Sequence, residues 1–272
     1  MNPKPNTNPS EEHFDTYAAK NALRLARTAV DTSSFFAIRG PQGTGKTYPF
    51  QLIMNEWAEQ KLACKPIYFK CVPECDPERF LRSLVQTVTG QKYASWQRPN
   101  LHELIELASN TLAEQPANFL FVDNLNWICN GAGEMLLFLF DTVKDNGVRL
   151  GMATTTRTQT VELLAAERHP AFLDTVLLSP LTPNENLASL AVWEPRLQAL
   201  SEDYFGGREG GAEACKVAYE ATKGNFKAMR SFLATILTSY PTGAISLKEL
   251  ERCLSLRRAE VAGENNFQLV TA

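Results

Sequence analysis

The sequence lacks any apolar run of the roughly 18–20 residues that a membrane-spanning helix needs. Its first ten residues are polar, include three prolines and lack the apolar core of a secretory signal. We therefore expect no membrane partner and a cytoplasmic location. Residues 1–11 are predicted to form a flexible leader.

The sequence also lacks an excess of positive charge. It contains 27 Lys and Arg against 30 Asp and Glu, which gives a formal net charge of −3. A protein that binds nucleic acid with its whole surface is therefore excluded. Any such binding would use a local basic patch or depend on oligomerisation.

A complete set of zinc ligands is missing as well. The six cysteines are scattered through apolar segments, and only Cys64, Cys71 and Cys75 lie close together in the sequence. No second Cys/His cluster completes four ligands, so reduced thiols are the favoured interpretation.

One motif is complete. Residues 40–47 read GPQGTGKT, which fits G-x-x-x-x-G-K-[ST]. A β-like stretch at residues 35–39 precedes it and a helical pattern follows, as a phosphate-binding loop requires. Backbone N–H groups of such a loop and the following helix N-terminus bind polyphosphates. The sequence therefore predicts ATP binding by Gly40, Gly43, Thr44, Gly45, Lys46 and Thr47.

Strand and helix patterns alternate up to about residue 180, and only helical patterns follow. This order predicts an α/β fold, with a phosphate-loop core on a doubly wound parallel sheet and a small C-terminal all-helical lid. The predicted core covers residues 12–180, the lid 181–260 and a flexible tail 261–272. Predicted strands are 35–39, 66–70, 118–123, 148–155 and 173–178. Predicted helices include 12–30, 101–113, 134–144, 159–167, 184–197, 212–222, 226–237 and 247–256.

Asp123 ends a nearly all-apolar predicted strand, where a carboxylate faces the phosphate loop. We expect Asp123 and the Thr47 hydroxyl to hold Mg²⁺, while Lys46 neutralises the β- and γ-phosphates. The next residue is Asn124, where many ATPases have a catalytic Glu. A neutral amide orients water but accepts no proton, so we expect weak turnover at best.

Polar residues elsewhere are candidate sensors of the γ-phosphate. Thr154 or Thr155 ends a strand and is predicted to touch the phosphate or the attacking water, although a threonine also simply suits a strand end. In the lid, Lys227 and Arg230 share one face of a helix that follows Gly224-Asn225. In one interpretation, Lys227 or Arg230 reaches the phosphates. In the other, both belong to a basic helix face that is simply solvated.

The order of phosphate loop, Asp-terminated strand, polar strand end and helical lid resembles the AAA+ ATPases. More narrowly, it is similar to transposition regulators of the TnsC/TniB, MuB and IstB kind, over roughly residues 35–258. The narrower similarity includes Ile67-Tyr68-Phe69 followed by Cys75-x-Pro77. It continues through Leu181, Trp193-Glu194 and the segment 221–224, which reads ATKG.

This resemblance implies an ATP-dependent oligomer, a ring or helical filament, that wraps duplex DNA without reading its sequence. The oligomer would mark a target site, recruit a transposase and contact a target-selection factor. Family members complete the ATP site with an arginine of the neighbouring subunit. Arg168 is the candidate for that role, with Arg157 as the alternative.

The sequence departs from the family pattern at two places. Asn124 replaces the catalytic acid, and the segment 70–76, where relatives present basic residues to DNA, has one lysine and two acids. Candidate phosphate contacts to DNA are Lys70, Arg79, Arg82 and Lys92. The competing hypothesis is an ATP-driven assembly switch in signalling or defence that binds no DNA. A metabolic kinase fits the helical lid poorly.

Overall fold

The computed structural model describes residues 17–59, 63–71, 77–90, 100–125, 131–157 and 167–270, with the backbone alone at 209 and 260–270. The chain divides into two compact units, which we describe separately. The α/β unit comprises Thr16–Pro41 and Gly45–Leu178. The helical unit contains Gln42–Thr44 and Ser179–Ala272.

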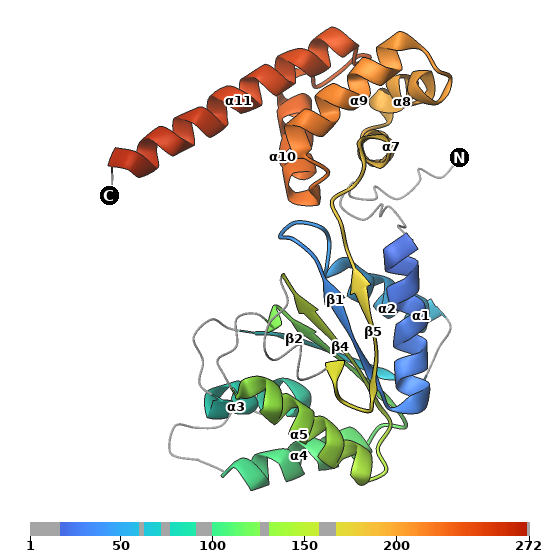
Figure 1. Ribbon diagram of the computed structural model, residues 1–272, viewed down its shortest axis with the longest axis vertical. Coiled ribbons are helices and arrows are strands. Elements are labelled where there is room, and N and C mark those ends of the chain that lie inside the picture. Colours follow the sequence, from blue (N-terminus) through green and yellow to red (C-terminus); the bar gives the residue numbers. More distant parts are fainter. Residues whose placement is uncertain are drawn as a thin grey trace, which may run out of the picture. The chain divides into compact units, whose positions relative to one another are not determined.

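The α/β unit is built on a parallel sheet of five strands in the order β2-β3-β4-β1-β5 (Figure 1). Every residue of β3 and β4 is buried, as expected for central strands that are covered on both faces. Because all strands run the same way, β1, β3 and β4 end at one edge of the sheet. The strands are β1 (Phe35–Arg39), β2 (Lys65–Lys70), β3 (Asn118–Asp123), β4 (Leu150–Thr156) and β5 (Phe172–Leu177).

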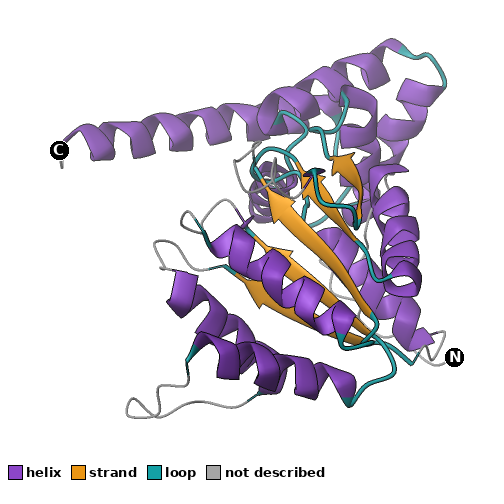
Figure 2. Ribbon diagram, turned by 60° about the horizontal axis from the view of Figure 1, so that its bottom comes forward, coloured by secondary structure: helices purple, strands orange, loops and turns teal. Residues whose placement is uncertain are grey.

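Helices cover both faces of this sheet (Figures 1 and 2). Two helices, α1 (Tyr17–Thr32) and α2 (Tyr48–Glu59), share one apolar core with the side chains of one sheet face. Three helices pack with the other face: α3 (Pro77–Thr89), α4 (Leu101–Ala113) and α5 (Ala132–Asp145). This arrangement confirms the predicted doubly wound α/β fold.

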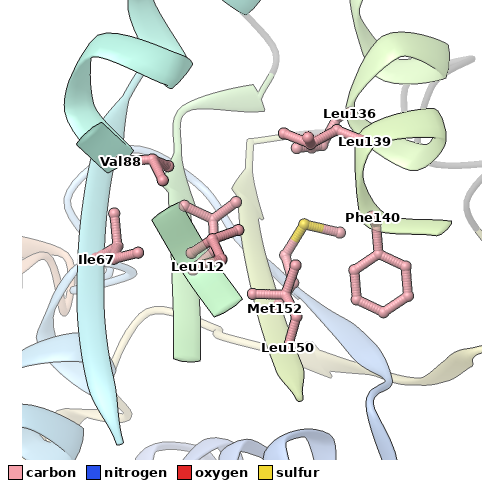
Figure 3. Close-up of a pocket in the computed structure, with 9 residues that line it drawn as sticks. Ile67, Val88, Leu112, Leu136, Leu139, Phe140, Leu150 and Met152 are labelled. Atoms are coloured by element: carbon pink, nitrogen blue, oxygen red, sulfur yellow. The ribbon is translucent and has the colours of Figure 1, made fainter. Parts of the chain in front are cut away.

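The core beneath α3, α4 and α5 contains a small void (Figure 3). It measures about 10 Å³ and is lined by apolar side chains that include Ile67, Leu112 and Met152. A buried water needs at least this much space and two to four polar partners. The void is therefore a dry packing defect of the core and gives no site for a ligand.

The helical unit has its own apolar core, formed between its helices. Its first helix begins with a capping box, in which the Thr182 hydroxyl accepts from the Glu185 N–H and the Glu185 carboxylate accepts from the Thr182 N–H. The elements are α7 (Pro183–Trp193), the 3₁₀ helix η2 (Pro195–Leu197), α8 (Gln198–Phe205), α9 (Glu209–Thr222), α10 (Phe226–Ser239) and α11 (Leu247–Val270).

Several boundaries differ from those that the sequence predicted. The helix α11 continues to Val270 and so includes most of the predicted tail 261–272. The leader 1–11 and nearly all of the helix predicted at 159–167 lie outside the described residues. In the part of the chain that the structure describes, no helix combines the length and apolarity of a membrane span.

Candidate nucleotide-binding site

The phosphate loop begins where β1 ends, at the carboxyl edge of the sheet. The Gly40 N–H donates to the Thr156 carbonyl over 3.2 Å, which ties the start of the loop to the end of β4. Gly43 and Gly45 have φ of 83° and 81°, a region that side-chain-bearing residues rarely adopt. The path of the backbone into α2 therefore favours glycine at both positions, of which the motif itself fixes only Gly45.

Lys46 lies folded against its own loop. Its Nζ donates to the Gly40 carbonyl over 2.8 Å and to the Pro41 carbonyl over 2.7 Å, and the residue is buried. Burial and the Arg157 charge lower the pKa of Lys46, while the Asp123 carboxylate raises it. Phosphate oxygens are better acceptors than these two carbonyls for a buried ammonium, because they carry charge.

Asp123, at the end of β3, is the centre of the site and is only 4% exposed. Its Oδ1 accepts from the Thr155 hydroxyl over 2.5 Å. Its Oδ2 accepts from the Tyr68 hydroxyl over 2.7 Å and from the Thr47 hydroxyl over 3.3 Å. Residues of β2, β3, β4 and the phosphate loop are therefore joined at one carboxylate.

Asn124 follows Asp123 in the left-handed backbone region, with φ of 61°. Asn tolerates this conformation better than most residues. Its N–H donates to the Thr155 hydroxyl over 2.8 Å, and its Nδ2 lies 3.3 Å from Asp123 Oδ2. The side chain thus donates to the carboxylate and supplies no base of its own.

The donor atoms at this point suit Mg²⁺. Thr47 supplies a hydroxyl oxygen and Asp123 a carboxylate oxygen, 3.3 Å apart, and hard divalent cations prefer oxygen ligands of this kind. When bound, the cation would neutralise phosphate charge. These two residues would hold it, and their role as Mg²⁺ ligands stays a prediction.

Tyr68 is a site residue that we did not predict. It lies on β2, where it pairs with Phe121, two positions before the pair Lys70 and Asp123. Burial first, and then the hydrogen bond and charge of Asp123, raise the pKa of Tyr68, so the phenol stays protonated and donating at neutral pH. The period of two along β2 would have placed Tyr68 and Lys70 on one sheet face, which was the available signal.

The tip of the phosphate loop, Gln42–Thr44, belongs to the helical unit. Asn225 Nδ2 donates to the Gln42 carbonyl over 2.6 Å, and the Phe226 N–H donates to the Gly43 carbonyl over 2.9 Å. A Cβ at Gly43 would lie 2.2 Å from Asn225 Oδ1, so a side chain there would clash. Asn225 also caps α10 through that same oxygen.

The other candidate residues have varied surroundings. Thr154 and Thr155 are buried in β4, whereas Lys227 and Arg230 are exposed on α10. Their roles as phosphate sensors stay predictions.

Arg168 is exposed and precedes β5. It therefore lies near the amino edge of the sheet, opposite the phosphate loop. Arg157 follows β4, and its charge acts on Lys46.

The candidate DNA contacts lie in the α/β unit. Lys70 ends β2 and Arg79 begins α3, and both are exposed. Arg82 is partly neutralised by an ion pair with Glu78 one turn earlier. Lys92 lies outside the described residues, and DNA contact by all four residues stays a prediction.

The cysteines that the structure describes are not grouped as a metal site. Cys64, Cys71, Cys215 and Cys253 are reduced thiols, while Cys75 and Cys129 lie outside the described residues. Among the residues that the structure places, no group of three or more His, Cys, Asp and Glu is arranged to hold an ion. The site at Asp123 thus depends on hydroxyls and one carboxylate.

Comparison with known proteins gives the fold. Residues 28–161, just under half of the chain, match a family model described as an AAA domain. The structure is similar to that of the Aeropyrum pernix Orc1 protein in complex with DNA, with a TM-score of 0.61 and 12% identity over 92% of this chain and 66% of that one. The chain has an AAA+ fold.

Two further structures share this AAA+ fold. Domain III of the Thermotoga maritima replication initiation protein DnaA has a TM-score of 0.54 and 16% identity over 89% of this chain and 93% of that one. Cdc6p of Pyrobaculum aerophilum has a TM-score of 0.56 and 12% identity over 93% of this chain and 83% of that one. No curated protein matches the sequence. The chain spans about two thirds of the Orc1 chain, and identities this low establish the fold alone.

The Thr155 hydroxyl supports two neighbours at once, so its removal is expected to destabilise the site. Thr155→Val should lower the free energy of unfolding by about 1–3 kcal/mol, because the Asn124 N–H loses its acceptor and Asp123 loses a donor. Thr154→Val, a matched change at a buried neighbour in the same strand, should cost less. Urea denaturation of both variants measures the difference, and equal losses would contradict this account of Thr155.

Proposed function

We propose that this AAA+ protein is an ATP- and Mg²⁺-dependent switch that assembles on duplex DNA and hydrolyses ATP slowly. The observation that carries the proposal is the Asp123 site. Lys46, Thr47 and Asp123 meet the chemical needs of a bound Mg²⁺–triphosphate, whereas Asn124 stands where a catalytic base is needed. Binding would therefore be retained while turnover is weak.

The roles of the residues follow from their contacts. Lys46 would exchange the two loop carbonyls for phosphate oxygens, and the loop N–H groups would bind the remaining oxygens. Asn124 donates to Asp123 through its amide and has no lone pair basic enough to take a proton from water. Thr155 already bridges Asp123 and Asn124, which suits a residue that senses what is bound there.

Assembly into an oligomer is supported by the place of Arg168. It precedes β5, near the edge of the sheet opposite its own phosphate loop, and its side chain is exposed. An arginine so placed does not reach the site of its own α/β unit. A neighbouring subunit's phosphates are the partner that it fits, which makes ATP a link between subunits.

The DNA-associated part of the proposal draws on charge and on the comparisons. Lys70 and Arg79 are exposed cations of the α/β unit, in a protein whose net charge is −3. A few phosphate contacts repeated along an oligomer give strong binding through avidity. One structure with the same fold is of a protein in complex with DNA. The motif order shared with TnsC/TniB proteins favours an adaptor that marks target DNA, recruits a transposase and meets a target-selection factor.

Lys46→Ala is expected to abolish ATP-dependent DNA binding, because the loop loses the cation that neutralises the phosphates. Lys65→Ala, which removes an exposed lysine at the other end of β2, should leave it intact. Sedimentation with random-sequence duplex DNA at two salt concentrations measures both. Wild-type oligomers that need ATP but ignore DNA would favour an assembly switch without DNA, and unchanged binding by Lys46→Ala would refute the nucleotide switch.

Asn124→Glu is expected to raise the rate of ATP hydrolysis by roughly a hundredfold, the lower end of what a positioned general base contributes. Asn124→Gln introduces a side chain as long as Glu but without its charge, and this variant should hydrolyse ATP as slowly as the wild type. Release of inorganic phosphate under saturating ATP measures the rates. Fast turnover by the wild-type protein, or an equal effect of Gln and Glu, would contradict the role assigned to Asn124.

A further inference from the structure

The Oδ2 oxygen of Asp123 has no spare acceptor position. In the described part of the α/β unit, Thr155 donates to Oδ1, while Tyr68, Thr47 and Asn124 all donate to Oδ2. An ionised carboxylate offers about four acceptor positions, about two on each oxygen. A further donor or a cation at Oδ2 must therefore displace a contact that the structure already makes.

The four contacts fall into two classes by length. Thr155 and Tyr68 donate over 2.5 and 2.7 Å, the range of strong hydrogen bonds from a hydroxyl to an anion. Thr47 and Asn124 lie 3.3 Å from Oδ2, beyond the usual range. The two short bonds hold one carboxylate oxygen each and so fix the rotation of the group. The two long contacts are the ones that exchange.

The Tyr68 hydroxyl is itself held in place by packing. The half-buried Tyr68 ring packs against Phe50, with ring centroids 5.2 Å apart, and stacks on Phe121 at an angle of 17°. Phe50 and Phe121 also contact each other, so the three rings form one cluster. Its backbone is fixed in register with β3. Little conformational freedom is left for this hydroxyl to lose when a ligand binds.

We propose that Tyr68 is a positioning residue for the divalent cation. Its hydroxyl fixes Asp123 Oδ2 so that the acceptor position now used by the long Thr47 contact faces Thr47, where the cation would bind. This inference rests on the proposed function, because it concerns the same Mg²⁺–ATP site. Partners that orient a metal-binding carboxylate typically change metal affinity by 10–100-fold when removed. Tyr68 is thus expected to set how much Mg²⁺ the site needs by acting through Asp123.

The test is Tyr68→Phe, which removes the hydroxyl and keeps the ring against Phe50 and Phe121. Binding of a fluorescent ATP analogue is titrated against Mg²⁺, and separately in EDTA. The variant should need roughly tenfold more Mg²⁺ for half-maximal binding, with its affinity in EDTA unchanged. Tyr219→Phe, the same loss of a hydroxyl in the helical unit, should behave like the wild type.

A double-variant cycle separates positioning from a general loss of structure. With Asp123→Asn as the background, Tyr68→Phe should cause no further change in the Mg²⁺ requirement, since the carboxylate that it orients is gone. An unchanged or lower Mg²⁺ requirement in Tyr68→Phe alone, or a further loss in the double variant, would overturn the inference. If the wild-type protein bound the ATP analogue equally well with Mg²⁺ and in EDTA, the proposed function would fail together with this inference. The outcomes named before overturn the inference alone, so the two failures are distinguishable.

Discussion

The structure of the site depends on the hydrogen bonds to one buried carboxylate. Asp123 receives short hydroxyl bonds from β2 and β4 and a longer one from the phosphate loop. Burying a charge is costly unless donors replace the water that it loses. Tyr68 and Thr155 replace that water before any ligand arrives, so the anion is already oriented toward Thr47. The same donors leave it poorly suited to act as a base.

The sheet explains how those donors reach one point. In a parallel sheet the strands end at a common edge, and the register pairs Lys70 with Asp123 and Val122 with Thr154. Tyr68 lies two residues before Lys70 on β2, and Thr155 lies one residue after Thr154 on β4. Both side chains therefore reach Asp123. The apolar layers on both faces keep the strands in this register. Packing far from the phosphates therefore sets the geometry of the polar site.

Much of this was readable from the sequence. The phosphate loop, the strand ending in Asp123 and the helix Leu101–Ala113 were all predicted, because glycine spacing and apolar patterns are local signals. Tyr68 was missed because the period of two along β2 gives only its sheet face, while its role also depends on β2 and β3 being neighbours. The contact of Asn225 with Gln42 joins residues far apart in the sequence and was missed for the same reason. The helix beyond residue 260 has no apolar periodicity, so it was predicted as a tail.

The central claim is that the protein holds ATP without consuming it quickly. The most direct test incubates the protein with ATP, Mg²⁺ and duplex DNA and separates the protein from free nucleotide at successive times. The nucleotide that remains bound is then identified as ATP or ADP. The DNA-bound protein is expected to carry mostly ATP for many minutes. A protein that carries mostly ADP within seconds, or no nucleotide at all, would contradict it.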